Sequence, residues 1–512
     1  MESNSSSPLF LFSQTTIPLA LFSLFTIFTA VFSLLAFLVY LLRLKPYWCN
    51  CHVCRTYLTS SWTADFDNLC DWYTHLLKKS PTGTIHVHVI NNVITSNPVN
   101  VEYMLKTNFA NYPKGKPFSA ILGDLLGRGI FNVDGETWRF QRKMASLELG
   151  SVSIRHFAYD VVSKEINFRL VPILSKFSSG GELVDLQDVF KRFSFDSICK
   201  FSFGLDPKCL LLSLPESELA DAFDVASMLS ARRALYASPV VWKVKRVLNL
   251  GSERKLRESV KVVKRKAEEI IQEKRLGSGS KLGSKDLLSR FMSIVDNDDY
   301  LRDIVISFLL AGRDTVASGL TSLFWLLSQN PNVVDRIREE ASRVLGDSGP
   351  ETQDPFSMPS FDQMKKMHYL NATVHESLRM FPPVQFDSKF TLVDDLLPDG
   401  TFVKAGTRVT YHQYAMGRMD RIWGPDCLEF KPERWLKNES FVPENPFKYP
   451  VFHAGFRVCL GKEMALVEMK SVALAVVQGF NIRIPDPGHV PRFIPGLTAT
   501  VRGGLPVLVE ER

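Results

Sequence analysis

Two long apolar stretches dominate the hydrophobic pattern of the chain. The first runs from Ile17 to Leu42, contains no charged side chain and is dense in Leu, Phe, Val and Ala. It exceeds the ~20 residues that a helix needs to cross a bilayer. The second, from Tyr300 to Gln329, is also apolar but includes charged residues. We therefore predict a membrane-spanning helix from the first stretch and a helix buried in the protein core from the second.

The residues that flank the first stretch predict its orientation. Arg43 and Lys45 follow it, whereas no Lys or Arg precedes it as in a signal peptide. Positive charge after the span favours a cytosolic body and a lumenal N-terminus. We expect a single-pass anchor in the endoplasmic reticulum membrane. Residues 1–45 would form the lumenal tip and the anchor, 46–80 a membrane-proximal linker and the start of the body, and 81–512 one large cytosolic domain.

Shorter patterns predict elements of this domain. Residues Thr84–Ile90 alternate β-branched and polar side chains, and Asn91-Asn92 can turn into residues 93–95, which is typical of a β-hairpin. A helix-like segment covers 96–111. Gly and Pro then mark 112–131 as a loop, and long loops inside compact domains are usually functional.

Composition narrows the class of protein. The 512 residues are 45% hydrophobic, and no Pro/Gly/Ser-rich linker or internal repeat divides them, so we expect one large domain behind the anchor. The net charge of +7 fits a basic face for an acidic partner or an anionic membrane. No zinc-finger spacing, RNA-recognition signature or long Lys/Arg run indicates nucleic acid. The Gly-rich segment 277–283 has the wrong spacing and context for a dinucleotide loop.

The eight cysteines do not suggest a secreted disulfide framework in so long a chain, and we expect reduced thiols. Cys49, Cys51 and Cys54 lie within six residues. They suggest metal binding, but no second Cys/His pair follows at zinc-finger spacing. We favour acylated or simply reduced membrane-proximal thiols, and metal binding stays open as the alternative.

Cys459 lies where a Gly-punctuated loop meets an apolar, helix-like run. A sulfur at a helix N-terminus faces unpaired N–H groups and the positive end of the helix dipole, which favour the thiolate. Such a thiolate can ligate haem iron. Gly455 and Gly461 would let a planar macrocycle approach the backbone, and Arg457 is placed to meet a carboxylate such as a haem propionate. The alternative is a small buried hydrophobe.

A second candidate group lies in the segment that starts at Asp134. Asp134 can cap a helix that carries Trp138 and Arg142 four residues apart on one face. Both side chains would then reach the same ligand. A surface amphipathic helix is the alternative.

An acid and a hydroxyl interrupt the apolar core helix at Asp314 and Thr315. Such groups are costly inside a buried helix unless they hydrogen-bond or serve chemistry. Gly312 would let a ligand approach the backbone, and Thr315 can bond back to a carbonyl and widen the helix locally. Otherwise this is only a polar break in the helix.

Four groups of residues together resemble the motifs of the cytochrome P450 (haem-thiolate) monooxygenases. They are Phe452-x-x-Gly455-x-Arg457-x-Cys459-x-Gly461, Trp138-x-x-x-Arg142, Ala311-Gly312-x-Asp314-Thr315, and Glu376-x-x-Arg379 with Arg434. The first matches every fixed position of the haem-binding signature, and the resemblance covers the chain beyond the anchor. It implies a mainly α fold with a smaller β portion that includes parts of 84–95 and 388–409.

The resemblance also implies roles for these residues. Haem b would be the cofactor, with Cys459 as axial iron ligand and metal site. The remaining cofactor-binding residues would be Trp138, Arg142 and Arg457 at the propionates, with Phe452 and Gly461 in the cysteine loop. On the opposite face Thr315 would hold dioxygen and its waters, and Asp314 would help to deliver protons.

Glu376, Arg379 and Arg434 would form a buried structural lock and would not be catalytic. An exposed pair of this kind contributes well under ~1 kcal/mol, whereas breaking a buried network costs about 3–5 kcal/mol. The family also implies electrons from a membrane-bound, NADPH-dependent flavoprotein reductase. Basic residues near the haem segments would form its docking face: Arg139, Lys143 and Lys462. We expect the protein to act as a monomer.

Finer resemblance points to the plant fatty-acid ω-hydroxylases and, among them, to the branch that oxidises jasmonoyl-amino-acid hormones. The stretches that carry it are 72–77, 123–131, 382–389, 414–418 and 452–465. One departure is Phe456, where many members have Pro. The resemblance implies ω-oxidation of jasmonoyl-isoleucine or 12-hydroxyjasmonoyl-isoleucine to the carboxylate, hence hormone catabolism. A medium-chain fatty-acid ω-hydroxylase is the alternative, and a peroxide isomerase or dehydratase and a non-catalytic haem sensor are rivals from other classes.

An elongated, acidic substrate needs an apolar channel that ends at the iron. By analogy with the family, the candidate lining residues are Phe118, Ile121, Leu125, Leu309, Val384, Phe386, Leu497 and Thr498. Lys389 is a weak candidate for binding the substrate carboxylate or a propionate, and we expect it to be a surface lysine.

Overall fold

The computed structural model describes residues 16–43, 49–236, 238–277, 286–346, 358–486, 488 and 490–512. The chain divides into two compact units, Met1–Thr59 and Ser60–Arg512. The expected lumenal tip before Thr16 and most of the Gly-rich segment 277–283 lie outside the described residues.

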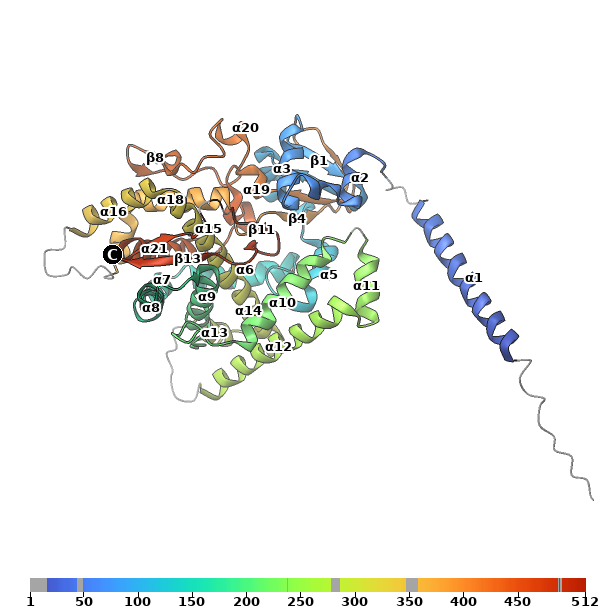
Figure 1. Cartoon of the computed structure of the whole chain (residues 1–512), viewed down its shortest axis with the longest axis horizontal. Coiled ribbons are helices and arrows are strands. Elements are labelled where there is room, and N and C mark those ends of the chain that lie inside the picture. Colours follow the sequence, from blue (N-terminus) through green and yellow to red (C-terminus); the bar gives the residue numbers. More distant parts are fainter. Residues whose placement is uncertain are drawn as a thin grey trace, which may run out of the picture. The chain divides into compact units, whose positions relative to one another are not determined.

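The first unit contains the predicted membrane helix. This helix, α1 (Thr16–Arg43), is followed by the short α2 (His52–Thr59) (Figure 1). Every described side chain of α1, from Ser23 to Val39, is exposed, although the segment is strongly apolar. Exposed apolar side chains on all faces of a helix are the pattern expected of a helix that lies in lipid. The helix therefore has the surface that a membrane anchor requires.

The second unit is organised around one long helix, which is built from α14 (Asp298–Leu309), the π-helical turn η6 (Leu310–Asp314) and α15 (Thr315–Gln329). The Asn297 side chain accepts a hydrogen bond from the Tyr300 N–H and caps its start. By length and composition this helix could also cross a membrane, but 67% of its most apolar stretch is buried inside the protein. It is the core helix that the sequence predicts.

Other α-helices surround this core helix, and α15 packs against four of them, α9, α16, α18 and α21. In the part of this unit that the structure describes, they are α3 (Leu69–Lys79), α4 (Pro98–Glu102), α5 (Gly115–Leu126), α6 (Gly135–Leu149), α7 (Val152–Glu165), α8 (Val171–Gly180), α9 (Leu186–Phe203), α10 (Glu218–Arg233), α11 (Pro239–Val247), α12 (Gly251–Gly277), α13 (Leu287–Met292), α16 (Pro331–Leu345), α17 (Phe361–Lys366), α18 (His368–Met380), α19 (Gln413–Met416), α20 (Asp420–Trp423) and α21 (Lys462–Gly479). The predicted loop 112–131 is wrong, because most of it forms α5.

The strands form small sheets. The largest has the order β1–β2–β7–β4, with β1 (Thr84–Val87), β2 (Asn92–Thr95), β7 (Arg408–Tyr411) and β4 (Asp387–Phe390). The predicted hairpin is confirmed, since β1 and β2 pair antiparallel with Thr84 opposite Thr95. A second sheet has the order β10–β13–β3, with β10 (Phe480–Arg483), β13 (Pro506–Glu511) and β3 (Val184–Asp185). Three two-stranded ribbons complete the set: β5 (Asp395–Leu396) with β6 (Phe402–Val403), β8 (Leu436–Lys437) with β9 (Ser440–Phe441), and β11 (Phe493–Ile494) with β12 (Thr500–Val501).

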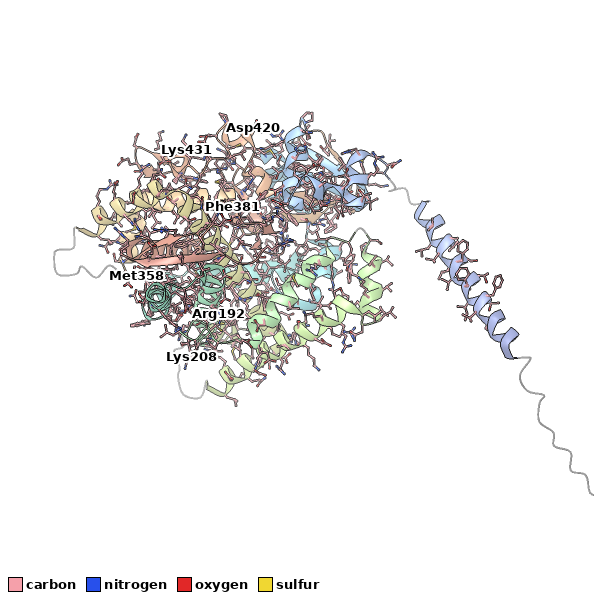
Figure 2. All side chains as sticks on the ribbon, viewed as in Figure 1. Arg192, Lys208, Met358, Phe381, Asp420 and Lys431 are labelled. Atoms are coloured by element: carbon pink, nitrogen blue, oxygen red, sulfur yellow. The ribbon has the colours of Figure 1, made fainter. Side chains whose placement is uncertain are left out.

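The expected mainly α fold with a smaller β portion is therefore confirmed. Side chains fill the space between the ribbons of the second unit (Figure 2). Phe381 at the end of α18 is buried there, whereas Lys431 is exposed at the surface.

A buried ionic network ties α18 to the chain that leads to the cysteine loop. The Arg379 guanidinium binds the Glu376 carboxylate through two hydrogen bonds of 2.7 and 2.8 Å, and Arg434 adds a third of 3.1 Å. The Lys431 N–H and the Trp435 indole N–H donate to the same carboxylate at 3.0 and 2.9 Å. Glu376 and Arg379 have no exposed surface. The carboxylate is thus fully satisfied inside the core.

Arg379 uses all of its donors in this network. Besides Glu376, it donates to the carbonyl oxygens of Gly417, Cys427 and Glu429. Arg434 reaches further, to the Asp426 carboxylate at 3.0 Å and to the Trp423 carbonyl at 3.1 Å. The three expected lock residues therefore meet, and they hold residues 417–435 against α18.

We expect Arg379→Leu to lower the free energy of unfolding by about 3–5 kcal/mol, because it leaves a buried carboxylate short of its counter-charge. Urea unfolding followed by tryptophan fluorescence measures this change. The matched control is Asp362→Ala, which breaks an exposed pair of the same spacing, with Lys365 Nζ 3.1 Å away. The control should cost less than about 1 kcal/mol. Equal effects of the two variants would contradict a structural role for the network.

Candidate active site

The cysteine loop is held by its own backbone. It consists of the short turns η9 (Pro450–Phe452) and η10 (Gly455–Arg457), and Cys459 lies just before α21. The Cys459 N–H donates to the Phe452 carbonyl at 2.8 Å, which closes the loop. Gly455 has a positive φ of 63°, and a Cβ there would overlap the carbonyl oxygen of Leu105. Gly455 is therefore needed for packing against a neighbouring turn, and the approach of a macrocycle there stays a prediction.

Burial dominates the acidity of Cys459. It raises the pKa of the thiol, and the N–H groups of Gly461 and Lys462 and the charge of Arg142 lower it by less. The helix N-terminus is present as predicted, but it does not produce a thiolate without help. Cys459 is itself exposed in the structure. A coordinated metal ion deprotonates a thiol outright, so an iron would supply the missing stabilisation.

Arg457 is the centre of an aromatic and ionic cluster beside the cysteine. Its guanidinium lies 4.5 Å from the centre of the Trp138 ring and 6.0 Å from that of Phe109. Its Nη2 donates to Asp134 at 2.5 Å, and its buried Nε has no hydrogen-bond partner among the described residues. Phe456, the departure from the family pattern, packs on Phe109 with ring centres 5.1 Å apart. Arg457 thus has a protein carboxylate and one donor left over.

Asp134 does not cap its own helix as predicted. It occupies the N-cap position of α6, but its side chain makes no cap hydrogen bond there. Its carboxylate accepts instead from the N–H groups of Lys114 and Gly115, at 3.0 and 2.8 Å, where α5 begins. Asp134 therefore joins the start of α5 to Arg457 in the cysteine loop.

A second ionic cluster lies under the same loop. Lys114 and Lys389 both bind the Asp387 carboxylate, and the Lys389 Nζ is 2.9 Å from it. The Tyr411 hydroxyl lies 3.2 Å from this carboxylate and 2.7 Å from Nδ1 of His453. The expectation that Lys389 is a surface lysine is wrong, since it is 1% exposed. Burial lowers the pKa of Lys389 to about 7, and burial lowers that of His453 to about 4.

These groups carry more positive than negative charge. The cations are Lys114, Arg142, Lys389 and Arg457, and the carboxylates facing them are Asp134 and Asp387. Arg142 has no carboxylate partner among the described residues, and burial lowers the pKa of its guanidinium. A buried surplus of cations is costly without anions. The two propionates of a haem would neutralise it, so the residues present fit that group.

The core helix widens at the predicted acid and hydroxyl. The turn η6 is π-helical, and π turns inside α-helices are frequent at functional sites. The Thr315 hydroxyl donates to the Ala311 carbonyl at 2.5 Å, as the sequence predicts. Gly312 also has a packing role, because a Cβ there would overlap the Ile198 side chain of α9. Gly312 therefore permits helix packing, and the approach of a ligand at Gly312 stays a prediction.

Asp314 is an unusual acid for a helix interior. Burial raises its pKa, and the neighbouring Arg313 lowers it by less. Arg313 is only loosely engaged with Asp314, at 3.3 Å, because the same Nη1 also binds Asp224 of α10. Asp314 is thus an acid whose pKa is raised by burial and which is the immediate neighbour of Thr315.

The candidate channel residues do not all belong to one apolar cluster. Five of the eight belong to one apolar cluster with Leu460 and Leu310: Phe118, Ile121, Leu125, Leu309 and Leu497. Leu125 and Leu309 have no exposed surface, so they support the wall without lining an open channel. Phe386 packs in a separate cluster, and Val384 and Thr498 belong to no apolar cluster of the described residues.

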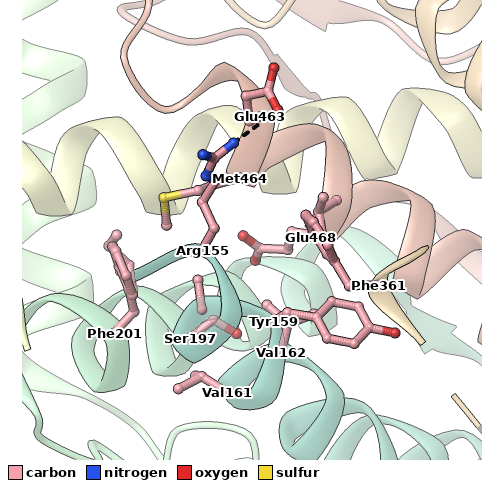
Figure 3. A pocket seen from close by; sticks show the side chains of 13 residues that line it. Arg155, Tyr159, Val161, Val162, Ser197, Phe201, Phe361, Glu463, Met464 and Glu468 are labelled. Carbon is pink, nitrogen blue, oxygen red and sulfur yellow. Dashed lines mark ion pairs between the residues drawn. The ribbon is translucent and has the colours of Figure 1, made fainter. Parts of the chain in front are cut away.

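A cavity elsewhere does not coincide with this channel. It lies between α7, α9, α17 and α21 and contains none of the eight candidate residues (Figure 3). Arg155 and Glu463 form an ion pair of 3.9 Å at it. Burial raises the pKa of Glu468, which also lines it, to about 8.

Sequence reasoning missed Lys114, Asp387, Tyr411 and His453 as parts of the site. Lys114 and Asp387 are 273 residues apart in the chain, and no local pattern links them. Only His453, inside the quoted cysteine motif, carried a signal that could have been followed.

Comparison with known proteins places the chain in a family. Residues 59–505 match the family model described as Cytochrome P450. Cytochrome P450 94C1 of Arabidopsis thaliana is 62% identical over 484 residues, which cover 93% of this chain and 96% of that protein. Cytochrome P450 94B1 of the same plant is 48% identical over 461 residues, covering 87% and 88%. Cytochrome P450 94A1 of Vicia sativa is 42% identical over 456 residues, covering 86% of each chain.

Members of this family are monooxygenases that hold a haem iron through a thiolate and receive electrons from a redox partner. The match spans most of the described second unit, and the relatives are aligned over nearly their whole length. The chain belongs to the cytochrome P450 family, in the group of plant enzymes numbered 94.

Proposed function

We propose that this P450 oxidises the terminal carbon of jasmonoyl-isoleucine and of its 12-hydroxy derivative, through alcohol and aldehyde to the carboxylate, and so inactivates the hormone. One observation carries the proposal. Phe118 and Ile121 of α5 share an apolar cluster with Leu310 of the widened turn and with Leu460, the neighbour of Cys459. An apolar wall that reaches the reacting centre suits an elongated substrate whose far end is oxidised.

In this proposal the cysteine side of the site holds the haem. Cys459 would ligate the haem iron, within a loop flanked by Phe452 and Gly461. The propionates are bound by Trp138, Arg142 and Arg457, and the surplus charge of Lys114 and Lys389 adds to their binding. The bound haem supplies the activation of dioxygen, which the thiolate promotes by donating electron density.

The opposite face positions water and protons. The Thr315 hydroxyl gives its hydrogen to the Ala311 carbonyl, so its oxygen remains able to accept a hydrogen bond from water at the site. Asp314, whose protonated form burial favours, can hand a proton toward that water. A positioned acid of this kind contributes roughly 10²–10⁴-fold to a proton-transfer step.

The same proposal includes the surroundings of the enzyme. Residues 1–45 anchor it as a monomer in the endoplasmic reticulum membrane, residues 46–80 lead into the body, and 81–512 form the cytosolic catalytic domain. An NADPH-dependent flavoprotein reductase supplies electrons at a face with Arg139, Lys143 and Lys462. In support of membrane contact, α11 exposes Val240, Val244 and Val247.

We expect Cys459→Ala to abolish the red-shifted Soret band of the reduced carbon-monoxide complex, because this band reports thiolate ligation. The matched control is Cys199→Ala, which removes a buried thiol of α9 and should keep the band. Difference spectroscopy of the two purified proteins checks this. A red-shifted band in Cys459→Ala would rule out Cys459 as the ligand.

Thr315→Ala should lower product formation by roughly 100-fold or more while NADPH consumption continues. The reason is that the variant lacks the hydroxyl that positions the water through which protons are delivered. The control is Thr321→Ala in the same helix, since Thr321 bonds back to the Ala317 carbonyl at 2.7 Å in the same way. The ratio of product to NADPH consumed is measured for both. A peroxide isomerase or dehydratase would tolerate Thr315→Ala and would turn over without reductase.

Incubation with 12-hydroxyjasmonoyl-isoleucine, reductase and NADPH should yield the aldehyde and then the acid, which mass spectrometry detects. Medium-chain fatty acids serve as the comparison substrates. Turnover of the fatty acids without any acid from the jasmonoyl conjugate would assign plain fatty-acid ω-hydroxylation. A haem sensor would give no product from either substrate.

A further inference from the structure

The three cysteines after the membrane helix form a thiol cluster. The sulfur atoms of Cys49, Cys51 and Cys54 all lie within 4.8 Å of one another. None of them forms a disulfide. Cys49 is half-buried, Cys51 is exposed and Cys54 has no exposed surface. All three belong to the first unit, outside the haem-binding domain.

Helix capping explains only part of this arrangement. Cys51 precedes α2, and its sulfur accepts a hydrogen bond of 3.4 Å from the Cys54 N–H, as an N-cap side chain does. This contact brings Cys51 and Cys54 together. Capping does not account for Cys49, which lies before the helix and whose side chain also hydrogen-bonds to that of Cys51.

Covalent alternatives fit the geometry less well. A disulfide would use two of the sulfurs and leave the third beside it, and disulfides do not persist in reducing compartments. Acylation requires an accessible sulfur, whereas Cys54 is fully buried. An arrangement that uses all three sulfurs explains the cluster better than one that uses one or two.

We propose that Cys49, Cys51 and Cys54 bind a thiophilic d¹⁰ cation, Zn²⁺ or Cu⁺, through three thiolates. Zinc–sulfur bonds of about 2.3 Å require sulfurs roughly 3.8 Å apart, so the cluster needs only a small closure. Soft thiolate donors select such cations over Mg²⁺ or Ca²⁺. Binding releases the thiol protons and fixes residues 49–54 in one geometry directly after the membrane anchor.

The test uses the full-length, haem-loaded protein in detergent. Its zinc and copper content per chain is measured by elemental mass spectrometry. About one metal ion per chain is expected in the unaltered protein. The double variant Cys49→Ser/Cys51→Ser, which leaves the buried Cys54 in place, should lose it. His52→Ala is the matched control, since it removes a potential ligand within the same segment but none of the three thiols. It should keep the metal.

Two further measurements make the outcome decisive. X-ray absorption at the zinc or copper edge should find about three sulfur neighbours, and loaded thiols should resist N-ethylmaleimide until a chelator is added. The carbon-monoxide spectrum of the double variant should be unchanged, which shows that its haem domain is folded. Equal metal content in unaltered and double-variant protein, or a thioester or disulfide at these cysteines, would overturn the proposal.

Discussion

The Glu376 carboxylate is the constraint on which the scaffold of the site depends. A buried charge is costly unless its partners are supplied, and here five donors from Arg379, Lys431, Arg434 and Trp435 meet one carboxylate. The partners depend on one another, because the loss of any one of them leaves a buried charge or a buried hydrogen-bond donor unsatisfied. The network therefore forces α18 and residues 417–435 to form together, and the cysteine loop follows directly in the chain.

The charges beside Cys459, unlike the Glu376 network, are not balanced by protein groups alone. Four cations face two carboxylates there, and the lowered pKa of Lys389 shows that its present partners do not compensate for its burial. The protein thus completes the scaffold from its own residues but leaves this cluster to be completed by an anion. It follows that the lock contributes to stability with or without haem, whereas in the proposed arrangement the second cluster would become fully favourable only when propionates bind to it.

The sequence predicted what is local and missed what is not. The hairpin of β1 and β2, the buried core helix and the hydrogen bond from Thr315 to Ala311 all depend on residues a few positions apart. Helix α5 was predicted as a loop because the Asp134 carboxylate at its start comes from about twenty residues further on. The burial of Lys389 depends on Lys114, on Asp387 and on packing between remote segments. The spacing of hydrophobic residues along the sequence does not reveal that packing. The packing roles of Gly455 and Gly312 could not be predicted for the same reason. Their neighbours in space, Leu105 and Ile198, are far from them in the sequence.

Helix α5 links the charged cluster beside Cys459 to the apolar wall that includes Phe118 and Ile121. Its first residues are tied to Asp134, and through it to Arg457, while Lys114 is tied to Asp387. Phe118 lies one turn later, and the Lys114 ammonium is 4.1 Å from the centre of its ring. Phe118 also packs against the apolar wall. A change at Lys114 or Asp134 would therefore move the wall as well as the charges. Residues beyond the first turn, such as Ile121, are free of these ties, so a change in the shape of the apolar wall is most easily accommodated there.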